Sequence, residues 1–192
     1  MSGTFFCLLP STCAIIIQVL YDFEYTEDLT LNTNKSNYQE LLVKSALIAA
    51  LYAALTMLLP FSYLGVQFRV AEVLTLLVFI DRRYIYGLTF GCLIANLGSP
   101  LGPIDVIFGT LATLIALQLI ARTKNLLLAT LWPAIVNGLI IGAILYYLLD
   151  LPYLLSAAQV FLGEFVVVTL IGYFLFKRIL RDEKLVSMLK FS

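Results

Sequence analysis

The chain is almost continuously apolar from residue 42 to residue 176, and short polar turns divide this stretch into six segments. The segments cover residues 42–59, 68–80, 84–97, 103–121, 127–149 and 152–176. The last three approach or exceed the ~20 residues that a helix needs to cross a bilayer, whereas the second and third are short. The pattern predicts an all-α, polytopic membrane protein, a bundle of six transmembrane helices.

Basic residues occur in alternate turns of this pattern. The turns near residues 60–67, 98–103 and 150–152 contain no Lys or Arg. Basic residues collect instead at Lys44, Arg82, Arg83, Arg122, Lys124, Lys177, Arg178, Arg181, Lys184 and Lys190. Turns rich in Lys and Arg remain in the cytoplasm. We therefore expect both ends of the six-helix core to be cytoplasmic.

Composition supports this interpretation and excludes several classes of function. Hydrophobic residues make up 61% and charged residues 12% of the 192 residues, against roughly 45–50% and 25% in soluble domains. The net charge is zero, which gives no indication of a nucleic-acid partner, and histidine is absent. Three cysteines without metal-ligand spacing argue against a disulfide framework or a metal site. We predict no catalytic residue, no metal and no enzyme activity.

The two ends of the chain differ from the core. Residues 1–41 contain an apolar stretch broken by Pro10 and a polar, acidic stretch, and we interpret them as an atypical N-terminal extension, disordered or the product of a misplaced start. The stretch lacks the basic beginning of a secretory signal peptide. The substrate-binding domain is expected at residues 42–180, and residues 181–192 form a basic cytoplasmic tail.

Polar side chains within the apolar segments are the candidates for ligand binding. Ionisable groups in a bilayer cost roughly 2.5–3.5 kcal/mol near a helix centre, so those that are retained usually face a cavity or a partner. In the six-helix arrangement most of these side chains lie toward the outer half of the membrane, and we expect them to form a pocket open to the outside. The candidates are Gln67, Arg69, Glu72, Asn96, Asp105, Asn137, Gln159 and Glu164.

Several of these residues also have a purely structural interpretation. Arg69 and Glu72, three apart on a helix, can pair with each other. Asp105 follows a proline at a helix start, where a carboxylate is favourable. Asn96 can cap its helix and Asn137 can bridge two helices. Glu164 is hardest to explain structurally, because no cation lies near it in the sequence.

Small residues in the first apolar segment offer a surface for close helix packing. Ala46, Ala50 and Ala54 recur at intervals of four, and Ala49 and Ala53 follow on a neighbouring row. Such a stripe lets the backbone of another helix approach closely. It serves either packing within the bundle or docking of another subunit.

Three stretches of the sequence form a recognisable set of motifs: Val66-Gln67-Phe68-Arg69-Val70-Ala71-Glu72, Gly91-Cys92-Leu93-Ile94-Ala95-Asn96-Leu97 and Asp105-Val106-Ile107-Phe108-Gly109-Thr110-Leu111-Ala112-Thr113. Together they resemble the QueT family, the substrate-binding S components of energy-coupling factor (ECF) transporters, which implies a multi-pass protein in the cell membrane of a prokaryote. The resemblance extends from about residue 42 to residue 180 and includes Asn137-Gly138 and Gly163-Glu164. Residues 1–41 match nothing in that family.

The resemblance implies capture of a small nucleobase- or vitamin-like solute from outside. Queuosine precursors such as 7-aminomethyl-7-deazaguanine are the implied ligands, and hydroxymethylpyrimidine or a pyridoxine-like ring would suit a similar site. The implied partners are the ECF transmembrane coupling subunit, which docks on the alanine stripe, and two ABC ATPase subunits that use ATP. The chain needs no cofactor of its own and has no GxxxxGK[ST] loop. The alternative is a stand-alone secondary transporter of a small polar solute.

Overall fold

The computed structural model describes residues 35–59 and 68–191. By internal contacts the chain divides into two units, Met1–Tyr38 and Gln39–Ser192, and the second unit contains the whole of the predicted membrane domain. Every regular element in the described residues is a helix, in agreement with the predicted all-α class. The N-terminal extension predicted for residues 1–41 lies almost entirely outside the described residues, as does Gln67.

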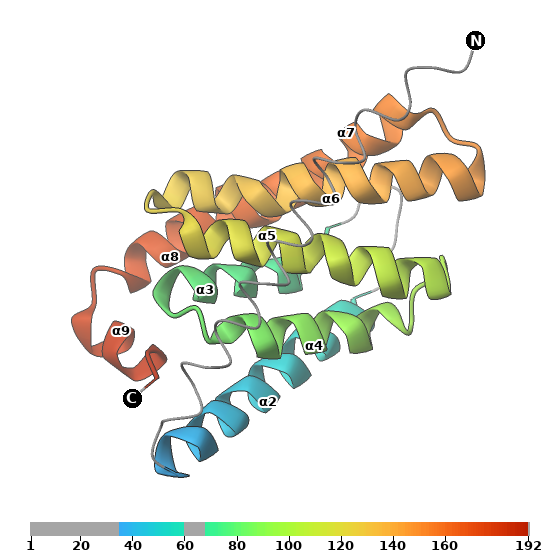
Figure 1. Ribbon diagram of the computed structural model, residues 1–192. Coiled ribbons are helices and arrows are strands. Elements are labelled where there is room, and N and C mark those ends of the chain that lie inside the picture. Colours follow the sequence, from blue (N-terminus) through green and yellow to red (C-terminus); the bar gives the residue numbers. More distant parts are fainter. Residues whose placement is uncertain (1–34, 60–67, 192) are drawn as a thin grey trace, which may run out of the picture. The chain divides into compact units, whose positions relative to one another are not determined.

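Seven helical segments follow one another along the described chain (Figure 1). Three are single α-helices, three combine α-helix with 3₁₀ or π turns, and the last is a short helix in the basic tail. In order they are α2 (Lys35–Leu58), η2 with α3 (Val70–Leu76 and Leu77–Ile80), α4 (Tyr84–Asn96), η3 with α5 (Asp105–Gly109 and Thr110–Arg122), α6 (Leu126–Leu149), α7 with η4 and α8 (Tyr153–Glu164, Phe165–Gly172 and Tyr173–Ile179), and α9 (Glu183–Leu189).

Four of these segments are long and apolar enough to cross a membrane: Tyr38–Leu58, Asp105–Arg122, Leu126–Leu149 and Tyr153–Ile179. Val70–Ile80 and Tyr84–Asn96 are shorter apolar helices, and α4 has 13 residues where about 20 are needed. The predicted count of six transmembrane helices is therefore not confirmed. The coarser prediction, a helical protein with several membrane-spanning helices, is confirmed.

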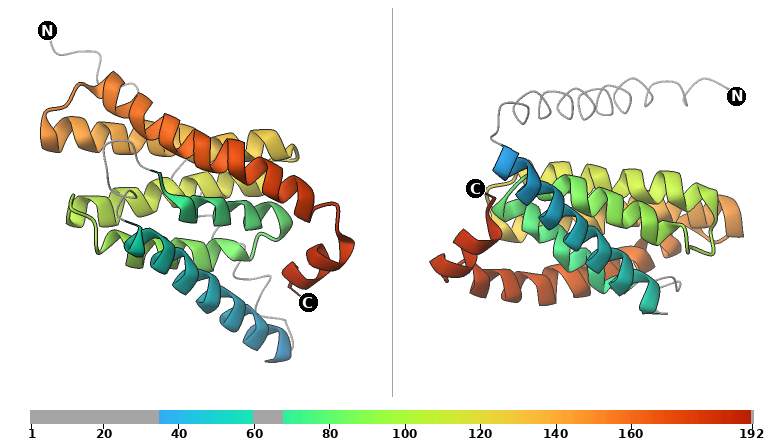
Figure 2. Two further views of the ribbon diagram at one scale, coloured as in Figure 1. Left: turned by 180° about the vertical axis from the view of Figure 1, so that it is seen from behind. Right: turned by 90° about the horizontal axis from the view of Figure 1, so that it is seen from below.

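Glycines bring neighbouring helices unusually close together. A Cβ on Gly91 of α4 would lie 2.7 Å from the carbonyl oxygen of Ala49 in α2, and one on Gly142 of α6 would lie 2.7 Å from Cα of Ala157 in α7. No side chain fits in either place, so these positions require glycine. Figures 1 and 2 show α7 lying along α6 over most of its length.

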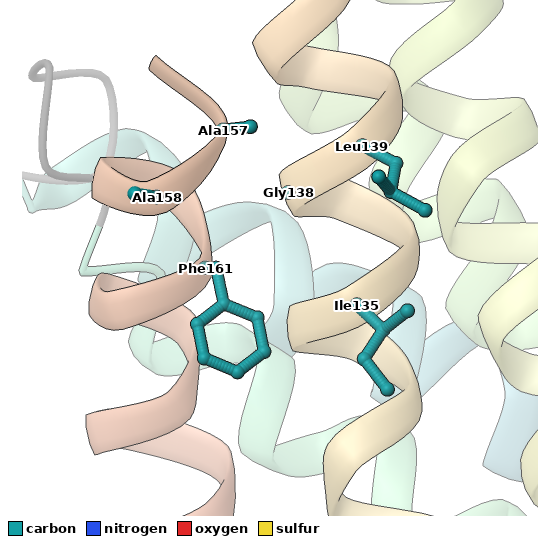
Figure 3. Close-up of a pocket in the computed structure, with 6 residues that line it drawn as sticks. All are labelled: Ile135, Gly138, Leu139, Ala157, Ala158 and Phe161. Carbon is teal, nitrogen blue, oxygen red and sulfur yellow. The ribbon is translucent and has the colours of Figure 1, made fainter. Parts of the chain in front are cut away.

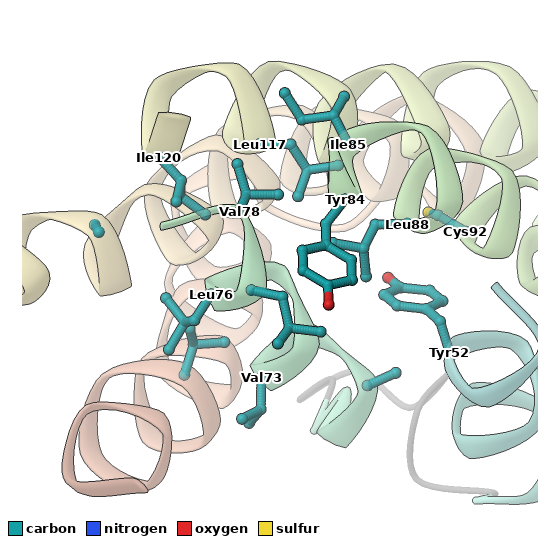
Figure 4. Close-up of a cluster of buried hydrophobic side chains, with 14 of the residues drawn as sticks. Tyr52, Val73, Leu76, Val78, Tyr84, Ile85, Leu88, Cys92, Leu117 and Ile120 are labelled. Carbon is teal, nitrogen blue, oxygen red and sulfur yellow. The ribbon is translucent and has the colours of Figure 1, made fainter. Parts of the chain in front are cut away.

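The main hydrophobic core lies between α2, η2 with α3, α4, α5 and η4 (Figure 4). Leu76, Leu88 and Leu117 are completely buried there. The core also takes in Tyr52 from α2, whose hydroxyl group points away from its own helix and into the bundle. A polar group carried into such a core requires a hydrogen-bond partner.

The basic turns meet at one end of the bundle, together with the C-terminal tail. Lys44 donates hydrogen bonds to the carbonyl oxygens of Met188 (3.1 Å) and Lys190 (2.8 Å), and Arg83 donates to the carbonyl oxygen of Phe191 (2.7 Å). The Phe191 ring lies 4.8 Å from the guanidinium carbon of Arg83. The tail predicted for residues 181–192 is thus helical over Glu183–Leu189 and is held against the bundle.

Candidate functional site

Buried polar side chains from six different parts of the chain gather inside the bundle. We call them the polar cluster: Tyr52, Arg69, Glu72, Asn96, Asp105, Asn137 and Glu164. Each is at most 1% exposed. Six of the seven were predicted from the sequence as ligand-binding residues, and the structure brings these six together.

Arg69 and Glu72 enter the cluster from the start of a 3₁₀ helix, and they have different partners. The Arg69 guanidinium lies 3.5 Å from a carboxylate oxygen of Asp105, which opens the π-helical segment η3. Glu72 instead accepts a hydrogen bond of 2.5 Å from the Tyr52 hydroxyl. The pairing of Arg69 with Glu72 that their spacing suggested is therefore not the one found.

Asn137 of α6 and Glu164 of α7 form the other side of the cluster. The Asn137 amide donates a hydrogen bond of 2.8 Å to one carboxylate oxygen of Glu164. Glu164 is within electrostatic range of Glu72 and Arg69, which connects the two sides. Glu164 is the last residue before the π-helical segment η4, and Asp105 begins the other π-helical segment, η3. Such wide turns are frequent at functional sites.

Asn96, at the end of α4, borders the cluster near Asp105. Its amide donates to Thr110 Oγ1 (3.2 Å) and to Cys92 Sγ (3.4 Å). Gly109 closes this side: a Cβ there would lie 3.0 Å from the Asn96 amide nitrogen, so a larger residue would displace the polar side chains.

Many polar atoms of the cluster have no hydrogen-bond partner. They are Nε and Nη2 of Arg69, the second carboxylate oxygen of Glu72, the side-chain oxygens of Asn96 and Asn137, both carboxylate oxygens of Asp105 and the second carboxylate oxygen of Glu164. Buried polar atoms are nearly always hydrogen-bonded in proteins, because an unmade bond costs about 1–3 kcal/mol. So many in one place make the polar cluster the candidate ligand site of the described chain.

The charges of the cluster point to the kind of molecule that it would hold. Glu72, Asp105 and Glu164 contribute three carboxyl groups, whereas Arg69 is the one cation among the cluster's side chains. A ligand with several N–H donors, or with a positive charge, would supply what the carboxylates lack. The arrangement can therefore provide hydrogen bonds and charge compensation to a group that carries donors or a positive charge.

The predicted opening of this site to the outside is not found among the described residues, because all seven side chains are buried. Two hollows of the surface lie elsewhere. One, of about 260 Å³, runs between α6 and α7 and is lined by the apolar side chains of Ile135, Leu139 and Phe161 and by small residues (Figure 3). The other, of about 580 Å³, is lined by charged residues at the turn from α8 to α9.

The remaining predicted residues lie outside the cluster. Gln159 is half-buried in α7, five residues before Glu164. In the alanine stripe, Ala46, Ala50 and Ala54 are exposed, whereas Ala49 and Ala53 are at most 7% exposed and face the interior. The exposed three leave a face of α2 available to another helix, and the buried two serve packing within the bundle.

Sequence reasoning missed Tyr52, Cys92 and Thr113. The Cys92 thiol donates to Thr113 Oγ1 at 3.2 Å, directly beside Asn96. A tyrosine near the middle of an apolar helix, away from the membrane interface where tyrosines gather, was the available signal for Tyr52.

The family model of the QueT transporter matches residues 42–181 of the chain. The chain belongs to the QueT transporter family. Among curated proteins, the Queuosine precursor transporter QueT of Lactococcus lactis subsp. cremoris (strain MG1363) is 44% identical over 81 residues, which cover 41% of this chain and 47% of that protein. The chain thus matches about half the length of that relative. No solved structure matches it significantly.

Membership of the QueT transporter family agrees with the motifs quoted above and with a multi-pass membrane protein. The matched residues include the whole polar cluster and exclude all of the N-terminal extension, residues 1–41. A transporter family also favours solute binding over catalysis.

Proposed function

We propose that this chain is the substrate-binding membrane subunit, the S component, of an ECF-type ABC importer and that it captures a queuosine precursor. The observation that carries the proposal is the polar cluster: a buried group of carboxylates and amides whose hydrogen-bonding atoms are largely unpartnered, in a member of the QueT transporter family. The name of the Lactococcus relative supports the choice of ligand.

The chemistry of 7-aminomethyl-7-deazaguanine suits the cluster. Its ring presents several N–H donors and one carbonyl acceptor, and its aminomethyl group is a cation at neutral pH. Glu72 and Glu164 each have one carboxylate oxygen free to accept, and Arg69 has free N–H groups to donate. The cation would offset part of the negative charge of three carboxylates. Hydroxymethylpyrimidine and pyridoxine-like rings offer fewer donors and no permanent cation.

The proposed membrane arrangement has six crossings with both ends of the core in the cytoplasm. Support comes from the gathering of the basic turns and the C-terminal tail at one end of the bundle, which positive-inside topology requires. The two shorter helices, η2 with α3 and α4, would then lie where other helices surround them.

The proposed partners are an ECF transmembrane coupling subunit and two ABC ATPase subunits. The exposed alanines of α2, Ala46, Ala50 and Ala54, provide a surface that a helix of the coupling subunit can approach closely. The sequence contains no Walker A loop, so ATP would be used by the partners.

Reconstitution tests the proposal. The purified chain in liposomes should bind radiolabelled 7-aminomethyl-7-deazaguanine saturably, with hydroxymethylpyrimidine and pyridoxine competing poorly. It should accumulate the ligand only when an ECF coupling subunit, its ATPases and ATP are added. Accumulation by the chain alone along an ion gradient would instead establish a stand-alone secondary transporter, and a lack of saturable binding to all three rings would refute a binding subunit.

A further inference from the structure

Helix α2 has two functional faces, and a single residue connects the inner one to the polar cluster. Ala46, Ala50 and Ala54 are exposed, whereas Ala49, Tyr52, Ala53 and Thr56 face the interior. Tyr52 is completely buried, and its hydroxyl donates the hydrogen bond to Glu72. Among the described residues, this is the side-chain hydrogen bond that ties α2 to the cluster.

Close backbone packing also holds α2 against α4. Ser45 and Ala49 pack directly on the backbone of Gly87 and Gly91 in α4, where a Cβ would lie 2.6 Å and 2.7 Å from their carbonyl oxygens, and the Cβ of Tyr52 also lies close to Gly91. These contacts are steric and non-directional, and they set how closely α2 approaches α4. The hydrogen bond from the Tyr52 hydroxyl adds a directional constraint between the second half of α2 and the polar cluster.

Glu72, the acceptor of that bond, uses only one of its two carboxylate oxygens in a hydrogen bond. Its first carboxylate oxygen takes the Tyr52 hydroxyl, and its second has no hydrogen-bond partner. A ligand that donates an N–H group to the second oxygen would fix the carboxylate in one orientation. The bond to Tyr52 would then hold the second half of α2 in one orientation as well.

We infer that Tyr52 is a positioning residue that couples occupancy of the polar cluster to the exposed alanine face of α2. Ligand binding orders Glu72, Glu72 holds Tyr52, and Tyr52 fixes the angle at which Ala50 and Ala54 are presented. The inference rests on the proposed function and adds to it the route by which a docking partner distinguishes the loaded subunit from the empty one.

Hydrogen–deuterium exchange of the full chain, with and without 7-aminomethyl-7-deazaguanine, tests this route. The variant is Tyr52→Phe, which keeps the ring in the core and removes the hydroxyl. In the wild type the ligand should slow exchange both in the second half of α2 and in the segments around Asn137 and Glu164. In Tyr52→Phe the protection around Asn137 and Glu164 should remain and the protection of α2 should be lost. Ligand affinity should fall by less than about tenfold, because the hydrogen bond that is removed lies within the protein and is not one of the ligand's own contacts.

Tyr84→Phe is the matched control. Tyr84 is also a buried tyrosine, 2% exposed, and its hydroxyl donates one hydrogen bond of 2.6 Å, but to the carbonyl oxygen of Leu189 at the other end of the bundle. This variant should behave like the wild type in the ligand response of α2.

The outcomes separate the inference from the proposed function. Protection of α2 that persists in Tyr52→Phe would overturn the inference and leave the binding function intact. Loss of protection around Asn137 and Glu164 in Tyr52→Phe would also overturn it, because Tyr52 would then be needed for binding itself. Absence of any protection in the wild type would instead refute the binding function and the inference together.

Discussion

Replacing Glu164 by glutamine changes the charge of the site while keeping its shape. In the structure one carboxylate oxygen of Glu164 accepts the hydrogen bond from Asn137, and the other is buried without a partner. Glutamine retains an acceptor for the Asn137 amide. It also places an NH₂ group where the free oxygen stood, so that a donor faces the donors of the ligand.

The expected loss follows from the bond that disappears. A hydrogen bond to a charged group contributes about 1.5–3 kcal/mol net, which corresponds to a Kd raised about 10- to 150-fold. The free energy of unfolding should change little, because the bond to Asn137 is kept. A ligand with the cationic aminomethyl group should lose more affinity than the neutral 7-cyano analogue, which lacks that charge.

Equilibrium dialysis with radiolabelled 7-aminomethyl-7-deazaguanine measures the affinity, and thermal unfolding in the same detergent measures stability. Glu183→Gln makes the same chemical change at an exposed position in α9 and serves as the control. If Glu164→Gln folds and binds with wild-type affinity, Glu164 has a structural role and the assignment of its free oxygen to the ligand is refuted.

Three further predictions concern stability, docking and topology. Asp105→Asn leaves Arg69 buried without its counter-ion and should destabilise the protein by about 3–5 kcal/mol, measured by denaturant or thermal unfolding; an unchanged stability would show that the pair is dispensable. Ala50→Trp should abolish ECF-dependent uptake with ligand affinity unchanged, while Ala50→Ser should preserve both; parallel loss of binding would assign the stripe to internal packing. Cysteines introduced one at a time at Pro100 and Lys124, in a chain that lacks Cys7 and Cys13 and keeps only the buried Cys92, should react with impermeant reagents from opposite sides, and same-side labelling would refute the proposed topology.

The overall class of the fold could be predicted because it depends on properties that are local in the sequence. Long apolar segments separated by polar turns can make all their backbone hydrogen bonds in a membrane only as helices. The positions of Lys and Arg then indicate on which side of the membrane each turn lies. The short second and third segments were recognisable from their length. Their position in the bundle could not be predicted, because it depends on packing against neighbouring helices rather than on their own composition.

Most members of the polar cluster could be predicted from the sequence, but which of these side chains contact each other could not. Arg69 and Glu72 are neighbours in sequence, yet Arg69 contacts Asp105 because the 3₁₀ turn and the π-helical start of η3 bring these two together. Irregular turns of this kind have no reliable local signature. Tyr52 was missed for a related reason: its role comes from which face of α2 is buried, and that is decided by the glycines of α4.

A structure of the chain determined with 7-aminomethyl-7-deazaguanine bound would show whether the polar cluster holds the ligand. We expect the ring inside the polar cluster, with N–H groups on the free carboxylate oxygens of Glu72 and Glu164 and with its cationic group among the carboxylates. A ligand seated elsewhere, such as in the apolar groove between α6 and α7, with the cluster unchanged, would contradict this expectation.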